Sequence, residues 1–413
     1  MSARADLVIA NATLRDRAGR HHIGIRGATV SAVSEDPLEG SQVLDADGRL
    51  VTESFVNAHL HLDKVYTLDR VGQHALREYT GERMAGAMSA IELASAVKRE
   101  YDESWIAPNV RRAVEAAVVH GVRHVLAFAD VDTAAGLRGI APVLAAREEF
   151  RGVVDLQVVA FPQDGLLRDP GAEELVREAM DLGADVVGGI PWIELSDADA
   201  HEHVRRMCQL AADRQRRVAM LVDDAGDPAL RTTEMLAGEM IRTGLVGRGV
   251  ANHARAIGQY AEPSVRRVIG LARKAGLGFV SDPHTAPLRL PVLQFLTAGI
   301  PVALGQDDIE DAYYPFGRHS MLEVAFLAAH LLSAVSDDAL DLLYDSVTTT
   351  AARVLGIEGH RLEVGGNADL VVLDGSTVRE VLARHSPPRY VVHGGRLVAE
   401  TETSSRLVPP RRG

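Results

Sequence analysis

The chain has 413 residues, of which 46% are hydrophobic, and a formal net charge of −13 at pH 7. Its length exceeds that of a typical single domain and predicts two domains, such as an α/β barrel with one companion. The acidic balance argues against a nucleic-acid-binding protein and favours a small-molecule partner.

The sequence also indicates a compartment. No stretch approaches the roughly 20 uninterrupted apolar residues of a membrane span, so we expect no membrane association. Residues 1–6 lack the long apolar segment of a secretory signal. The single cysteine, Cys208, cannot form an internal disulfide, which suits a reducing environment. We therefore expect a cytoplasmic protein.

Both ends of the chain are rich in short strands. Residues 6 to about 50 contain several apolar runs separated by turn residues, and similar runs recur at 368–373 and 390–398. Neither end is long enough to bury a core alone, so we expect the two to pair into one small β-sandwich. The predicted boundaries are 1–53 and 359–403 for the sandwich, 54–358 for a catalytic barrel, and 404–413 for a disordered tail.

Between the two ends, short apolar runs alternate with helical stretches, as repeated β-α units around a parallel sheet require. There are eight such runs, namely Phe55 to His59, Val122 to Asp130, Val153 to Phe161, Val186 to Pro191, Val218 to Asp223, Gly249 to His253, Leu277 to Asp282 and Ile300 to Asp307. Eight units predict a (β/α)8 barrel of the TIM type.

The sequence predicts the bounds of two of the helices. Pro108 to His120 carries an apolar stripe that includes Val110, Val114 and Val118. Pro228 to Thr243 is the second, and Asp227 is its expected N-cap.

Polar residues follow most of the predicted strands, and the carboxyl ends of barrel strands are where such folds place their chemistry. These residues are His59, His61, Asp130, Gln163, Asp223, Asp224, His253, Asp282, His284, Asp307 and Asp308. His59 and His61 stand two apart on a strand and so project to one side, which is half of a metal site. The alternative is that one histidine is buried and hydrogen-bonded while the other caps the strand.

Two further histidine pairs carry less weight. His201 and His203 lie in a polar helical stretch, where residues two apart face different ways, and we expect both at the surface. His21 and His22 belong to the N-terminal strands.

Longer motifs then show a family resemblance. They are His59-x-His61-x-Asp63-Lys64, Leu156 to Gly165, Gly183 to Pro191, Gly305 to Asp308 followed by Tyr314 to Gly317, Ala351 to Gly356, and Gly365 to Leu370. With them the chain resembles the amidohydrolase superfamily over nearly its whole length, and within it the cytosine deaminase-like group.

The resemblance implies one divalent metal ion, zinc or iron, held by two strand-one histidines, a strand-five histidine and a strand-eight aspartate. Such a metal lowers the pKa of a water molecule, and a nearby carboxylate carries its proton to the departing amine. When these roles are transferred to this sequence by position, His59, His61 and Asp307 match metal ligands, and Asp307 also matches the base that acts on the water. His253 matches the strand-six histidine that polarises substrate or water.

The same resemblance assigns the substrate contacts. Gln163 matches the side chain that reads the ring amide of the substrate, and Asp308 would help to place the substrate. Lys64, Trp192 and Tyr313 are candidates for the pocket lining, although packing or surface charge would explain them equally well. Related enzymes are commonly oligomeric, which implies a homo-oligomer.

Strand five departs from the group's pattern. Where the group has His-Cys-Asp-Glu, this chain has Leu221-Val222-Asp223-Asp224, so the metal-binding histidine is replaced by leucine and the catalytic glutamate by aspartate. Three interpretations remain open. The site keeps its metal through an adjusted His253 or Asp223; it binds metal weakly and catalyses another reaction; or it has lost metal and uses His253, Asp224 and Asp307 as ordinary acid-base groups.

The first hypothesis is therefore a metal-dependent hydrolase or deaminase that cleaves a C–N bond of a small cyclic nitrogen-containing substrate, with Asp224, His253 and Asp307 as catalytic residues. The second is a non-hydrolytic enzyme on the same barrel, such as a cyclase, lyase or isomerase. The third is a catalytically silent ligand-binding protein.

Overall fold

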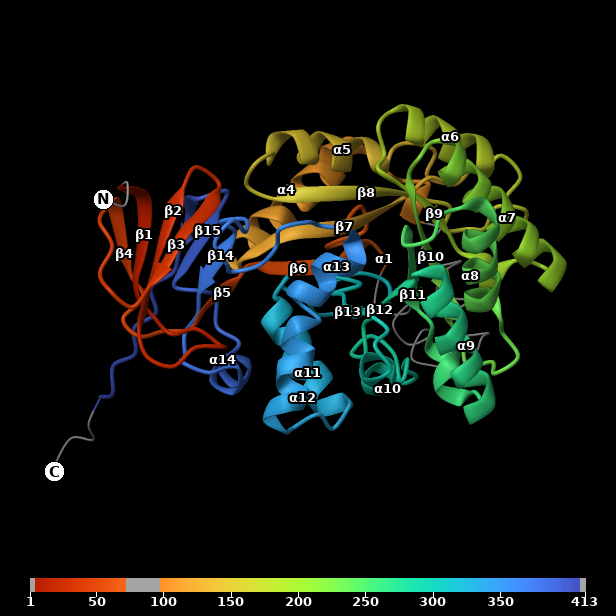
Figure 1. The fold of residues 1–413 in the computed structure, drawn as a ribbon. Helices are drawn as coiled ribbons and strands as arrows, with labels where there is room; N and C mark the ends of the chain where they lie inside the picture. Colours follow the sequence, from red (N-terminus) through yellow and green to blue (C-terminus); the bar gives the residue numbers. More distant parts are fainter. Residues whose placement is uncertain (1–3, 72–96, 409–413) are drawn as a thin grey trace, which may run out of the picture.

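The computed structural model describes residues 4–71 and 97–408, and its centre is a sheet of eight parallel strands (Figure 1). In sheet order they are β13 (Val302–Leu304), β12 (Gly278–Ser281), β11 (Gly249–His253), β10 (Arg217–Val222), β9 (Val186–Gly189), β8 (Asp155–Phe161), β7 (Val122–Asp130) and β6 (Phe55–His61). Each predicted apolar run overlaps one strand, so the predicted (β/α)8 barrel is confirmed.

The barrel closes where β13 meets β6. His61 N donates to the Asp307 carbonyl and Asp307 N donates to the His59 carbonyl, both at 2.9 Å. Just before Asp307, a Cβ on Gly305 would lie 2.6 Å from His59 Cβ, closer than two carbons can approach. Only glycine therefore lets the chain after β13 run this close to the histidine strand.

Helices cover the outer face of this sheet (Figure 1). They are α1 (Leu68–Val71), α4 (Glu103–Val119), α5 (Ile140–Glu149), α6 (Ala172–Asp181), α7 (Asp197–Asp213), α8 (Thr232–Thr243), α9 (Glu262–Ala275), α10 (Val292–Thr297), α11 (Met321–Leu331), α12 (Asp337–Asp345) and α13 (Thr349–Leu355). Short 3₁₀ turns follow β9 at Pro191–Ile193 and β11 at Arg255–Gln259.

The start of α4 differs from the prediction. The Asp102 side chain accepts a hydrogen bond from Ser104 N at 2.8 Å, so the helix begins at Glu103 and Pro108 lies inside it. Pro108 costs the helix one backbone hydrogen bond. The predicted apolar stripe nevertheless faces the barrel, because Val110 and Val114 are fully buried. The cap and this stripe together outweigh the proline.

The sandwich consists of two four-stranded sheets beside the end of the barrel where β6 begins (Figure 1). One contains β3 (Thr29–Ser34), β2 (His21–Arg26), β1 (Ala5–Ala12) and β4 (Gly40–Asp45); the other contains β16 (Arg396–Glu400), β15 (Tyr390–His393), β14 (Leu370–Val372) and β5 (Val51–Glu53). Helix α14 (Val378–Arg384) connects β14 to β15.

Both ends of the chain contribute to this domain. β5, from the N-terminal end, pairs antiparallel with β14 from the C-terminal end. The two sheets also share one apolar core, made of Leu7, Ile9, Ile23, Ile25, Val51, Leu370, Val372, Val392 and their neighbours. The predicted β-sandwich built from both ends is therefore confirmed.

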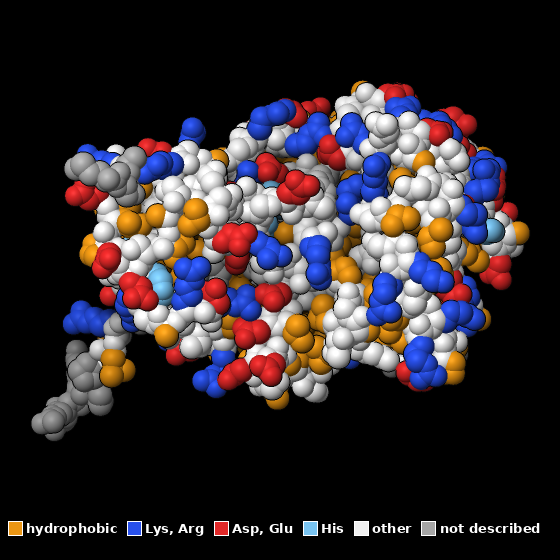
Figure 2. Space-filling view, viewed as in Figure 1, with side chains coloured by type: hydrophobic (Ala, Val, Ile, Leu, Met, Phe, Trp, Pro, Cys, Tyr) orange, Lys and Arg blue, Asp and Glu red, His pale blue; other side chains and the backbone are white. Residues whose placement is uncertain are grey.

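The surface is chemically mixed. On the face shown in Figure 2, acidic and basic side chains are interspersed. Within the described ranges, no helix combines the length and the apolar character needed to cross a bilayer. Of the tail predicted at 404–413, residues 404–408 contain neither helix nor strand, and residues 409–413 lie outside the described part of the chain.

The shared sandwich predicts that the barrel is poorly soluble alone. A truncated protein spanning residues 52–358 loses every strand of the sandwich except Thr52 and Glu53 of β5, which then have no partner strand, and it exposes apolar surface. We expect aggregation by size-exclusion chromatography with light scattering, under conditions where the full chain is monodisperse. A truncated protein as monodisperse and as stable as the full chain would contradict the shared-sandwich account.

Candidate active site

One pocket opens at the carboxyl ends of the barrel strands, with about 430 Å³ of empty space including any open solvent at its mouth. The residues that line it are His61, Gln163, Ile190, Trp192, Leu221, Asp224, His253, Arg255, Asp307, Asp308 and Tyr313. Most of the residues proposed from the sequence therefore meet in one place, with His59 and Lys64 packed behind the wall.

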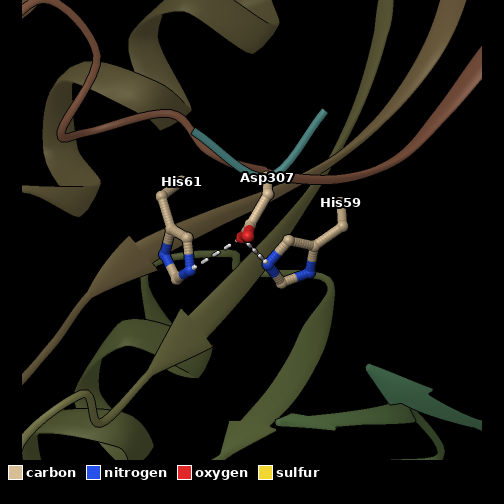
Figure 3. Close-up of side chains that lie close together, drawn as sticks. All are labelled: His59, His61 and Asp307. Carbon is tan, nitrogen blue, oxygen red and sulfur yellow. Dashed lines mark ion pairs between the residues drawn. The ribbon is translucent and has the colours of Figure 1, made fainter. Parts of the chain in front are cut away.

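Asp307 is the centre of the polar cluster (Figure 3). Its Oδ1 lies 3.2 Å from His59 Nε2 and 3.9 Å from His61 Nε2, and His253 Nε2 also lies 3.9 Å away. Its Oδ2 accepts a hydrogen bond from Thr285 Oγ1 at 2.8 Å and lies 3.4 Å from Arg255 Nη2. One carboxylate oxygen is thus anchored while the other faces three imidazole nitrogens.

His59 has the tautomer that a metal ligand needs. Asn252 Nδ2 donates to the Met220 carbonyl at 3.2 Å, which turns Asn252 Oδ1 toward His59 Nδ1 at 3.0 Å. His59 Nδ1 must therefore carry a proton, which leaves Nε2 as the nitrogen that could bind a metal. Nε2 is buried and has no hydrogen-bond partner among the residues that the structure describes. An imidazole whose other nitrogen donates in this way is typical of metal-binding histidines.

His61 needs one adjustment to bind metal. Lys64 Nζ donates to His61 Nδ1 at 3.3 Å, which leaves the ring proton on Nε2, toward Asp307. Burial, followed by the charge of Lys64, holds the pKa of His61 well below its usual value, so the ring is neutral. Moving the proton to Nδ1 breaks only the contact with Lys64, which keeps Asp130 and Gln163 as partners. The set His59, His61 and Asp307 therefore fits a divalent metal.

Strand five supplies no ligand. Leu221 lines the pocket and cannot bind metal. Asp223, the other ligand considered above, is excluded because its carboxylate accepts hydrogen bonds from Thr232 N at 2.6 Å and from Thr233 N at 3.2 Å. Asp223 therefore caps α8. The prediction that Asp227 caps a helix starting at Pro228 is wrong, because α8 begins at Thr232 and the side chain of Asp227 accepts from Ala229 N in the preceding turn.

Asp224 is a candidate proton carrier. Its Oδ1 pairs with Arg255 Nη1 at 2.7 Å, while its Oδ2 lies 3.9 Å from His253 Nε2. Burial raises the pKa of Asp224 above its usual value, although Arg255 and His253 oppose the shift, and the like charges of Asp282 and Asp307 add to it. Arg255 thus holds the carboxyl group through Oδ1, and Oδ2 is the oxygen that could exchange a proton.

His253 is anchored on its opposite side. Its Nδ1 lies 2.8 Å from Asp282 Oδ1. Burial by itself would lower the pKa of His253, but the carboxylates of Asp224 and Asp282 outweigh burial and raise it to about 9. The ring is therefore protonated near neutral pH, with its Nε2 facing Asp224 and Asp307.

Lys64 orients Gln163 from behind the pocket wall. Its Nζ pairs with Asp130 Oδ1 at 3.0 Å and donates to Gln163 Oε1 at 2.6 Å. Because an ammonium group can only donate, the amide oxygen of Gln163 is occupied and its Nε2 hydrogens remain for a ligand. Burial opposes the charge on Lys64, but Asp130 and Asp63 outweigh it and raise the pKa of Lys64.

Three strand-end residues have left-handed backbone conformations. Asp223, His253 and Asp307 have φ angles of 46°, 67° and 65°. Such angles are uncommon outside glycine and cluster at functional sites, where the surrounding structure compensates their cost. Here these angles turn the chain immediately after a strand, so that the side chains of consecutive residues point to different parts of the structure. Asp223 caps a helix while Asp224 faces the pocket.

Sequence reasoning missed Arg255 and Asn252, and misplaced His203. Arg255 contacts Asp224, Asp282 and Asp307. The sequence feature that could have indicated it is a basic residue two positions after His253. Although His201 is half exposed, His203 is fully buried, so the surface prediction is wrong for His203. His203 Nδ1 pairs with Glu194 at 2.7 Å, and its Nε2 accepts from Ile190 N, which fixes the end of β9.

Comparisons with known proteins identify the family of the chain. A family model described as the amidohydrolase family matches residues 93–399. N-isopropylammelide isopropyl amidohydrolase of Pseudomonas sp. (strain ADP) is 31% identical over 97% of this chain and 99% of its own length. Pterin deaminase of Rhizobium rhizogenes is 26% identical over 96% and 88%. A structure of 5-methylcytosine deaminase from Klebsiella pneumoniae with phosphonocytosine has a TM-score of 0.90 and 27% identity, over 97% of this chain and 100% of that one.

The capping role of Asp223 predicts a loss of stability on mutation. Asp223→Ala removes the acceptor for two backbone N–H groups at the start of α8, and should lower the free energy of unfolding by about 2 kcal/mol or more. Urea denaturation measures the change. The matched control, Asp227→Ala, should change it by less than about 0.5 kcal/mol. Equal effects of the two substitutions would contradict the assignment of the cap.

Proposed function

The chain belongs to the amidohydrolase family and is a hydrolase of C–N bonds other than peptide bonds; from this premise we propose that it removes an amino or alkylamino group from a small cyclic nitrogen compound in a metal-dependent reaction. The observation that carries the proposal is the convergence of His59, His61 and His253 on Asp307 Oδ1 inside the pocket. This arrangement has no evident role in stability, since it gathers groups that lack good hydrogen bonds to one another.

His59, His61 and Asp307 would hold the metal. Three protein ligands are the number that catalytic zinc sites keep, so the loss of a strand-five ligand at Leu221 does not by itself prevent binding. When bound, a divalent metal supplies the activation of water near neutral pH. Zinc and iron both suit imidazole and carboxylate donors.

The remaining groups would handle protons. Asp224 Oδ2 is the oxygen that does not pair with Arg255, in a carboxylate with a raised pKa, and it would accept a proton from the attacking water and return it to the leaving nitrogen. His253, fixed by Asp282, faces the same volume and would donate a hydrogen bond to the substrate from Nε2. The carbon gains the water oxygen, and the amine leaves with the transferred proton.

The pocket wall presents hydrogen-bond donors. Gln163 offers its Nε2 hydrogens, and the indole N–H of Trp192 has no hydrogen-bond partner in the described part of the chain. Burial and the like charges of Asp307 and Asp311 hold the pKa of Asp308 well above its usual value, so that this carboxyl keeps its proton to higher pH. A donor-rich wall favours a substrate with ring nitrogens or carbonyl oxygens. The ammelide, pterin and cytosine named for the relatives are cyclic nitrogen compounds of this kind.

A substrate screen tests the proposal. The full chain, loaded in turn with zinc and iron, would be incubated with amino- and alkylamino-substituted triazines, aminopyrimidines, pterins and cyclic amides. We expect the unmodified chain to release ammonia or an alkylamine from at least one of these substrate classes. The Asp307→Asn variant, which lacks the carboxylate ligand of the proposed metal, should release none. A folded, metal-loaded protein that releases no amine from any of these classes would overturn the proposal.

The role of Asp224 predicts a selective loss of turnover. Asp224→Asn keeps the size of the side chain and removes the proton acceptor, so kcat should fall by about 10²-fold or more with little change in stability. Asp227→Asn is the matched control, because Asp227 lies outside the pocket, and its turnover should equal that of the unmodified chain. If Asp224→Asn were as active as this control, Asp224 would have no part in the mechanism.

A further inference from the structure

A second group of buried histidines lies far from the pocket, at the junction of the barrel and the sandwich. His124 is near the start of β7, whose last residue, Asp130, is roughly 20 Å farther along the strand at six residues' distance. His360 follows α13, and Asp369 directly precedes β14 of the sandwich. One potential ligand atom from each of these three residues lies within 4.8 Å of the others. His393, at the end of β15, lies beside them.

The tautomers of these histidines are set by carbonyl groups. His360 Nε2 donates to the Ser54 carbonyl at 2.8 Å, and His393 Nδ1 donates to the Val153 carbonyl at 2.7 Å. Because a carbonyl can only accept, the other ring nitrogens, His360 Nδ1 and His393 Nε2, carry lone pairs. Neither has a hydrogen-bond partner among the described residues, and the same is true of His124 Nε2.

Unsatisfied acceptors of this kind are costly where they are buried. The exposed fractions are 7% for His124, 4% for His360, 5% for Asp369 and 1% for His393. A bound cation that accepts their lone pairs would satisfy these nitrogens.

The charges around the cluster permit a cation. Arg123 Nε donates to Asp369 Oδ1 at 3.1 Å, and Arg123 Nη1 pairs with Asp155 Oδ1 at 2.9 Å. Asp155 Oδ2 lies 3.5 Å from His124 Nδ1, which favours a proton on that nitrogen and a lone pair on Nε2. The carboxylates of Asp369 and Asp155, together with that of Glu53 near His360, thus outnumber the one guanidinium.

We propose that His124, His360 and Asp369 bind a divalent transition-metal ion of the zinc class, with His393 as a further nitrogen donor, and that the ion ties the barrel to the sandwich. Imidazole and carboxylate donors suit zinc, and the second ring nitrogen of a zinc-bound histidine commonly donates to a carbonyl or carboxylate, as here. Zinc ligands in a tetrahedral site lie about 3.3 Å apart, so the donors need to close by no more than about 1.5 Å. The ligands come from a barrel strand and from the return of the chain to the sandwich, so an ion here would stabilise their junction.

Variants of the full chain distinguish zinc bound at this junction from zinc bound in the pocket. In a His59→Asn/Asp307→Asn background, which removes two ligands of the pocket, the protein is equilibrated with zinc, dialysed against metal-free buffer and assayed for zinc by mass spectrometry. We expect about one equivalent to remain. His360→Gln in this background should release it. The matched control, His21→Gln, replaces a buried histidine in the other sheet of the sandwich and should leave the zinc bound.

Two results would overturn the proposal: a background protein that keeps no zinc, or a His360→Gln variant that keeps as much as the His21→Gln control. Because His360→Gln carries a risk of misfolding, the background protein is also measured by zinc X-ray absorption. Two or three imidazole ligands with a light oxygen donor are expected. A spectrum without imidazole ligands would place the retained zinc elsewhere and would count equally against the proposal.

Discussion

The closure of the barrel at Asp307 is the constraint on which the site depends. The backbone of Asp307 bonds to both His59 and His61, so the last strand is joined to the first at the two histidines. The glycine two residues earlier permits this approach, since any side chain there would collide with His59. The side chain of the same aspartate then divides its oxygens between Thr285 and the three imidazoles. One residue therefore closes the fold through its backbone and gathers the candidate ligands through its side chain.

Within this frame, the altered strand five is accommodated by a neighbouring strand. A buried guanidinium is stable only when its charge is paired, and Arg255 pairs with Asp224, Asp282 and Asp307 at once. Those carboxylates in turn hold His253, which occupies the side of the pocket next to Leu221. Leu221 therefore removes one candidate ligand, relative to the pattern of the group, and the polar network around the other candidates is kept. A set of two histidines and one aspartate remains, in a pocket whose walls offer donors to a small ring.

The periodic parts of the architecture could be predicted from the sequence because they depend on local patterns. Alternation of apolar runs with helical stretches located all eight strands, and the polar residues that follow most of these strands pointed to the pocket. Features that depend on distant neighbours could not be found in this way. Asp223 caps a helix that begins nine residues later, whereas Asp227 had the expected position in sequence. Pro108 lies inside a helix because Asp102 caps its start, and His203 is buried because Glu194 and the end of β9 face it. The role of Arg255 could not be predicted, because it depends on three carboxylates that come from other parts of the barrel.

The central claim is that His59, His61 and Asp307 still share a metal ion although Leu221 has replaced the fourth ligand. An anomalous difference map, collected at the zinc edge from crystals of the zinc-equilibrated full chain, tests it directly. The account predicts one peak bounded by His59 Nε2, His61 Nε2 and Asp307 Oδ1, which disappears in Asp307→Asn crystals. A well-ordered map with no peak between these three side chains would contradict it.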